Sequence, residues 1–134
     1  MAGIDLSTFK LGWRPNQYFA APNNFSARAK PHGAVPDYDI AVEQLEKLFR
    51  EVALAQPRVS MVNEDAARRQ LDLVQRSALF KFPDRISVQF VDRGNGKSSA
   101  AIYSRSTYGI GDMGVNKRRV ETWLVELGRR VGAV

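Results

Sequence analysis

Two stretches of the chain place apolar residues at the spacing of an α-helix. The first follows Asp39, a residue type that caps helix N-termini, and stops before Pro57. Its apolar positions are Val42, Leu45, Leu48, Phe49 and Val52. The second carries Val120, Trp123, Leu124, Leu127 and Val131, which form one apolar stripe. The spacing therefore predicts two amphipathic helices, one on each side of the central part of the chain.

Between these helices the pattern changes to that of β-strands. Four short segments, 58–62, 69–76, 86–90 and 99–106, have strand character, and the third alternates apolar and polar residues strictly. The Asn-Gly pair within residues 92–97 is typical of a hairpin turn. The order helix, four strands, helix predicts an α+β fold, with an antiparallel four-stranded sheet and both helices packed on one face.

The first 36 residues have a different composition. They hold four of the six prolines, yet they also hold Phe9, Trp13, Tyr18, Phe19 and Phe25. Disordered tails are poor in aromatic residues, so we expect residues 1–36 to form an irregular arm. Its aromatic side chains would pack on a single α+β domain of residues 37–134. A mobile arm that docks on a partner is the alternative interpretation.

Composition excludes several kinds of site. The chain has no cysteine and one histidine, His32, so it can form neither a disulfide nor a zinc site. We expect no metal and no cofactor. No run of about 18 apolar residues and no signal-peptide segment is visible, which predicts a soluble, cytoplasmic protein without a membrane span. The net charge is +6, but Arg69 and Arg76 would face opposite sides of a strand, which disfavours nucleic-acid binding.

Residues 109–114, Gly-Ile-Gly-Asp-Met-Gly, match the G-x-G-x-x-G fingerprint of dinucleotide-binding turns. That fingerprint needs a following strand, and only the last helix fits into the 20 residues after Gly114. Asp112 would also put a negative charge where pyrophosphate binds. The glycines are better explained by a tight strand-to-helix turn with Asp112 or Asn116 as the cap. The alternative is an anion-binding site at the helix N-terminus, to which the cationic side chains of residues 117–119 would contribute.

Residues 103–120 resemble the signature of a bacterial family catalogued as domain of unknown function 1499. The matching residues are Ser104, Ser106, Gly109, Asp112, Gly114, Asn116 and Arg119. Residues 82–84, Phe-Pro-Asp, resemble a second landmark of the family, and residues 14–17 a weaker one. Tyr103 and Thr107 depart from positions that often hold arginine, and the cysteines of many members are missing. Many members look exported or membrane-anchored. The resemblance implies an α+β domain and no established activity.

The signature residues can form a cluster on physical grounds. Arg105 and Asp112 are close enough in sequence to pair across a tight turn. Ser104 and Ser106 share one strand face, with Arg105 on the other, and the amide of Asn116 can reach back to turn carbonyls. We interpret the cluster as a hydrogen-bonded lock between the last strand and the last helix. A ligand-facing cluster is the alternative.

Catalytic chemistry has weak support in the sequence. A Ser-His-Asp site needs an oriented base, and His32 lies far along the chain from Ser104 and Ser106. We therefore expect a non-enzymatic binding or accessory domain that recognises a protein partner, an anionic small ligand or a membrane surface. The alternative is a hydrolase-type enzyme that uses Ser104, Arg105, Ser106 and Asp112. Nucleic-acid binding through the basic surface is a lesser alternative.

Overall fold

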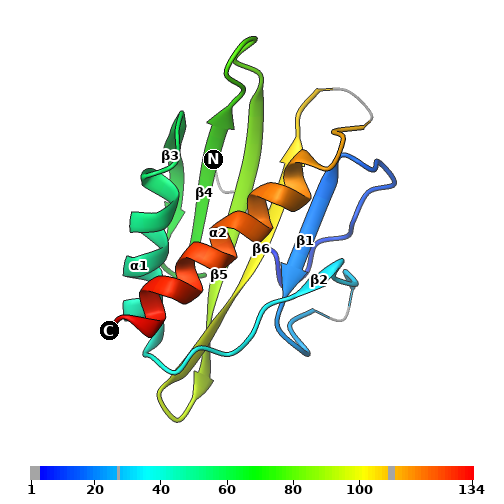
Figure 1. Cartoon of the computed structure of the whole chain (residues 1–134). Helices are drawn as coiled ribbons and strands as arrows, with labels where there is room; N and C mark the ends of the chain where they lie inside the picture. Colours follow the sequence, from blue (N-terminus) through cyan, green and yellow to red (C-terminus); the bar gives the residue numbers. More distant parts are fainter. Residues whose placement is uncertain (1–3, 27, 109–110) are drawn as a thin grey trace.

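One mixed sheet of six strands carries the fold. The computed structural model describes residues 4–26, 28–108 and 111–134. Its elements are β1 (Gln17–Ala21), β2 (Gly33–Ala34), α1 (Val42–Leu54), β3 (Val59–Asp65), β4 (Gln70–Arg76), β5 (Pro83–Gly94), β6 (Lys97–Ser106) and α2 (Val115–Gly132). The strand order is β2-β1-β6-β5-β4-β3 (Figure 1). Every neighbouring pair is antiparallel except β1 and β2, which are parallel.

The prediction of a four-stranded antiparallel sheet was wrong in strand number and in orientation. The two additional strands, β1 and β2, come from residues 1–36, which we expected to be irregular. β1 pairs with β6, with Phe19 opposite Tyr103 and Ala20 opposite Ile102. Its partner lies more than 80 residues further along the chain. The stabilising hydrogen bonds are therefore non-local, and no pattern within five residues reveals them.

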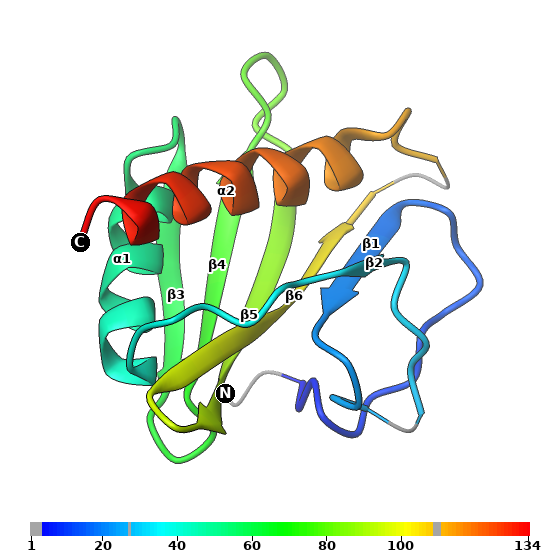
Figure 2. The ribbon, with the colours of Figure 1, turned by 60° about the horizontal axis from the view of Figure 1, so that its bottom comes forward.

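The two helices lie side by side on one face of the sheet, as the sequence predicts (Figure 2). The buried residues of α1 are Val42, Leu45, Phe49, Val52 and Ala53, and those of α2 are Asn116, Val120, Trp123 and Leu127. They meet Leu71, Leu73, Ile86, Val88, Phe90 and Ile102 of the sheet. The ring of Phe49 packs edge-on against Phe90 and Trp123, with centroids 5.5 and 5.9 Å apart. These side chains fill the layer between helices and sheet.

The N-terminal segment covers part of the opposite face of the sheet. Leu6 and Phe19 are fully buried there, together with Ala21, Ala29, Ala101 and Tyr103, and the partly buried Phe9 and Phe25 pack against them. Phe9 touches both Phe19 and Tyr103, with centroids 5.1 and 4.7 Å apart. The sheet therefore has an apolar layer on each side.

The ends of the helices and strands show which of the capping and turn residues expected from the sequence the structure uses. The expected cap of α1, Asp39, is not used, since the N-cap is Ala41 and makes no side-chain hydrogen bond. Gly94, Asn95 and Gly96 have φ values of 84°, 55° and 76°, so the β5–β6 turn uses the left-handed conformations that an Asn-Gly pair favours. No helix of the described residues has the length and apolar character that a bilayer span needs.

The packing of Trp123 gives a first test of this core. Trp123 is 2% exposed, so Trp123→Ala should lower the free energy of unfolding by about 3–5 kcal/mol. A loss of that size should lower the melting temperature by roughly 10 °C or more. Val125→Ala, two residues away on the same helix at a side chain that is 74% exposed, is the matched control. Equal melting temperatures for the two variants would contradict the placement of α2.

Candidate functional site

A buried polar cluster joins the end of β6 to the start of α2. Ser104 and Asn116 are both fully buried. The Ser104 hydroxyl donates to Oδ1 of Asn116 over 2.7 Å. The Asn116 amide nitrogen donates to the backbone carbonyl of Asn16 over 3.1 Å and to Oγ of Ser106 over 3.0 Å. One side-chain amide thus connects α2, β6 and the residue before β1.

Asp112 caps the N-terminus of α2. Its carboxylate accepts hydrogen bonds from the backbone amides of Gly114, at 2.9 Å, and Asn116, at 3.2 Å, and from the Asn116 side chain. Burial alone would raise the pKa of this carboxyl, but the hydrogen bonds outweigh it and lower the pKa below its ordinary value. The anion site that was the alternative interpretation of this helix end is therefore occupied by the protein's own carboxylate.

The turn before α2 needs glycine at one position. Gly114 has a φ of 80°, in the left-handed region, where a side chain would be strained. Gly109 of the signature lies outside the described residues. The positive φ supports the interpretation of the glycines as a strand-to-helix turn.

Arg119 makes the buried ion pair of the cluster, and its partner is Asp84. Nη2 of Arg119 lies 2.8 Å from Oδ2 of Asp84, and the two side chains are 9% and 17% exposed. Nε donates to Oε1 of Gln75 over 2.6 Å. Nη1 donates to Ser104 over 2.9 Å and to Asn116 over 2.8 Å. The Phe-Pro-Asp landmark and the C-terminal signature therefore meet at this arginine.

Arg105 does not pair with Asp112, contrary to our prediction. Side chains alternate along β6, so Ser104 and Ser106 face α2 while Arg105 faces the other side of the sheet. There its Nη1 donates to Oγ of Ser87 over 2.8 Å and to the carbonyl of Tyr103 over 3.2 Å. The Ser87 hydroxyl in turn donates to Asp72 over 2.6 Å. Burial lowers the pKa of the Arg105 guanidinium, although the Tyr103 and Asp72 charges oppose that shift.

The proposed catalytic grouping is thereby divided. Ser104, Ser106 and Asp112 lie on the helix side, and Arg105 lies on the other side of the sheet. His32 is held elsewhere: its Nδ1 accepts from the backbone amide of Phe19 over 2.9 Å, and its ring stacks on Tyr18. Within the described part of the chain, no group of three or more His, Cys, Asp or Glu residues could hold a metal ion. Ser104, Ser106, Asn116 and Arg119 hydrogen-bond to one another at the junction of β6 and α2.

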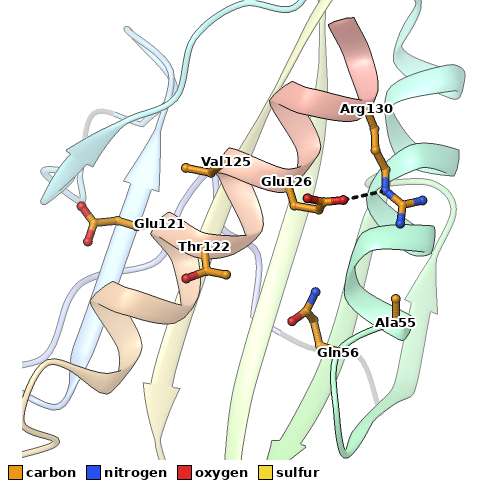
Figure 3. Close-up of a pocket in the computed structure, with 7 residues that line it drawn as sticks. All are labelled: Ala55, Gln56, Glu121, Thr122, Val125, Glu126 and Arg130. Atoms are coloured by element: carbon orange, nitrogen blue, oxygen red, sulfur yellow. Dashed lines mark hydrogen bonds and ion pairs between the residues drawn. The ribbon is translucent and has the colours of Figure 1, made fainter. Parts of the chain in front are cut away.

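Sequence reasoning missed two surface features. One is a groove of about 450 Å³ between the end of α1 and the outer side of α2, lined by Ala55, Gln56, Glu121, Thr122, Val125, Glu126 and Arg130 (Figure 3). Glu126 is paired there with Arg130 and with Arg129, whose hydrogen bonds lower its carboxyl pKa. The other is an aromatic tip, formed by Leu79, Phe80, Phe82 and Tyr108.

Comparisons with known proteins identify a family and a similar fold. The family model described as a protein of unknown function (DUF1499) matches residues 15–127. None of the curated proteins compared with the chain matches it. The di-domain ARO/CYC BexL from the BE-7585A biosynthetic pathway has a TM-score of 0.54 and 13% identity over 73% of this chain. This chain spans 45% of the length of that structure.

A solution NMR structure from Thermobifida fusca is also similar, with a TM-score of 0.45 and 11% identity over 74% of this chain and 91% of the other. The likeness to the BexL structure, at 13% identity, shows a similar fold and carries no activity across. The chemistry has to be argued from the residues of this chain.

The Arg119–Asp84 pair gives a second test. Asp84→Ala leaves the Arg119 charge buried and should lower the free energy of unfolding by about 3 kcal/mol or more in urea titrations. Asp37→Ala removes the partner of Arg93 in a pair whose side chains are 24% and 41% exposed, and should change stability by about 0–1 kcal/mol. Adding Arg119→Met to Asp84→Ala should recover part of the loss. Similar losses for Asp84→Ala and Asp37→Ala would contradict the buried pair.

Asp112 should make stability depend on pH. Its pKa in the folded state is lowered, so its contribution is present above the unfolded carboxyl pKa of about 3.9 and is lost as pH falls through the folded pKa. We expect the stability difference between wild type and Asp112→Asn to be largest above about pH 5 and to shrink below about pH 4. Urea titrations across this range measure it. A difference that is independent of pH would contradict a role for the carboxylate charge.

Proposed function

The chain belongs to the DUF1499 family of proteins of unknown function, and we propose that it is a non-enzymatic binding domain that docks its aromatic tip on an anionic membrane surface. The family match over residues 15–127 confirms the resemblance of the chain to this family. The description of the family names no activity, so the proposal is carried by one observation, which is the exposure of large apolar side chains at one end of the sheet.

The aromatic tip gathers side chains from two connections. Leu79, Phe80 and Phe82 of the β4–β5 connection are 78%, 67% and 50% exposed, and Tyr108, which follows β6, is 60% exposed. The rings of Phe80 and Phe82 stack with centroids 5.5 Å apart, and Tyr108 lies 5.4 Å from Phe82. The β4–β5 connection projects beyond the sheet (Figure 1). Soluble domains rarely expose such a contiguous apolar group without a binding role.

The connection is held in shape by its own hydrogen bonds. The backbone amide of Phe82 donates to Oγ of Ser77, and that of Ser77 to the carbonyl of Phe82, both over 3.0 Å. Nη1 of Arg76 donates to the carbonyl of Lys81 over 3.0 Å. Lys81 has a φ of 57°, which turns the chain between the two phenylalanines. A loop fixed in this way presents its rings to a surface at little cost in conformational entropy.

Charge favours an anionic bilayer as the occupant. Arg76, Lys81 and Arg85 are exposed on or beside the tip, and the acid of this segment, Asp84, is already paired with Arg119. Aromatic rings interleaved with cations suit the headgroup region, where rings enter the interface and lysine or arginine meets lipid phosphates. Each such cation contributes about 1 kcal/mol near an anionic leaflet. An apolar groove on a partner protein would contain no negative charges to pair with these three cations.

Vesicle co-sedimentation tests the proposal. The protein should pellet with vesicles of phosphatidylcholine and phosphatidylglycerol and remain in solution with phosphatidylcholine alone, and binding should weaken as salt rises. Replacing two of the three tip rings, Phe80→Ser with Phe82→Ser, should weaken binding at least about tenfold, because these two rings no longer bury apolar area.

Val125→Ser, at an exposed apolar residue on α2, is the matched control and should bind as the wild type does. Failure of the wild-type protein to bind anionic vesicles, or equal binding by the double variant, would overturn the proposal. In either case a protein partner for the aromatic tip becomes the question to test next.

A further inference from the structure

A pocket of about 230 Å³ opens on the face of the sheet opposite the helices, between the segment before β1 and the end of β6. Its walls include Trp13, Arg14, Gln17, Tyr103, Arg105 and Ser106. We call it the Arg105 pocket. Its lining includes two arginines and no acidic residue.

Arg105 has more hydrogen-bond donors in this pocket than it has partners. Nη1 makes both of its hydrogen bonds, to Ser87 and to the Tyr103 carbonyl. Nε and Nη2 carry three further N–H groups, and none of them has a partner within the described part of the chain. The nearest negative charge reaches Arg105 only through Ser87, whose hydroxyl donates to Asp72 over 2.6 Å. The guanidinium is therefore partly buried, without a directly bound carboxylate, and its unpaired donors are open to the pocket.

Neighbouring groups hold this guanidinium in place and add positive charge. The Tyr103 ring lies beneath Arg105, with the guanidinium carbon 4.8 Å from the ring centroid. Arg85 is the direct neighbour of Arg105 across the β5–β6 ladder, and the two charges repel. Arg14 is exposed at the rim, 5.8 Å from the centroid of the Trp13 ring. The potential at the pocket thus favours an anion.

Hydrogen bonds hold the rim of the pocket in place, so the rim has its shape before a ligand binds. The Tyr103 hydroxyl donates to Oε1 of Gln17 over 2.5 Å. The Gln17 amide nitrogen donates to the carbonyls of Gly12, at 2.6 Å, and Arg14, at 2.9 Å. These bonds fix residues 12–17 against β6. A ligand would not have to order this loop on binding.

We propose that the Arg105 pocket binds the oxyanion group, a carboxylate or a phosphate, of a small organic acid. Arginine presents paired N–H groups that match either oxyanion. Arg14 would supply a second charge from the rim, and the exposed ring of Trp13 suits an apolar or aromatic remainder. The volume is below the usual range for drug-sized ligands, so the ligand is small. This site is independent of membrane docking by the aromatic tip.

Isothermal titration with soluble probes tests the site without any membrane. The probes are acetate, benzoate, inorganic phosphate and phenyl phosphate. Tighter binding of benzoate than of acetate would show use of the aromatic walls, and a preference between benzoate and phenyl phosphate would identify the oxyanion. Arg105→Lys keeps the charge but loses the paired donors, and should weaken binding at least about tenfold. Arg129→Ala, on the far end of α2, should leave it unchanged.

A second variant keeps the test decisive if Arg105 variants fail to fold. Arg14→Glu reverses an exposed charge at the rim and should abolish binding while leaving the melting temperature near that of the wild type. The absence of binding by all four probes to the wild-type protein would overturn the inference. So would unchanged affinity in both Arg105→Lys and Arg14→Glu, which would leave Arg105 as a purely structural partner of Ser87.

Discussion

The buried amide of Asn116 is the contact on which the arrangement of the elements depends. It bonds to Ser104 on β6, to the backbone of Asn16 before β1 and to Asp112 in the turn, and it sits in the first turn of α2. Arg119 extends the same network to Asp84 on β5. A buried polar group costs free energy unless it is satisfied, so the network forms as a whole and fixes three strands and a helix relative to one another.

Strand β6 separates two chemically different environments. On the helix side, Ser104 is fully buried and every polar neighbour has a partner, including the charged pair of Arg119 and Asp84. On the other side, one residue along, Arg105 is partly buried, has donors without a protein partner among the described residues, and reaches Asp72 only through Ser87. The same strand thus carries a fully hydrogen-bonded network on one face and, on the other face, a cation with donors that no protein group among the described residues pairs. This difference directs the search for a ligand to the face that the helices leave uncovered.

The sequence predicted those features whose cause is local. Both helices, the β5–β6 turn and the opposite placement of Ser104 and Arg105 follow from periods of 3.6 and 2 and from Asn-Gly chemistry. Strand β1 escaped prediction because its partner is distant in the chain. The pairing of Arg105 with Asp112 was wrong because a short separation in sequence says nothing about which face each side chain occupies. Asp84 lies in the Phe-Pro-Asp landmark, but nothing in the sequence indicated that it pairs with Arg119, 35 residues further along the chain.

Side chains fill the core, so a ligand or partner would have to bind at the surface. Phe49, Trp123 and Leu127 occupy the space between helices and sheet, so the fold offers no reason to place a ligand there. The Arg105 pocket and the aromatic tip instead border the same junction, because Ser106, which lines the pocket, pairs with Asp84, two residues from Phe82. The hydrogen bonds around Asn116 join β6 to α2 at that junction. In the function proposed above, this network would serve binding by keeping both surfaces in shape before a partner arrives.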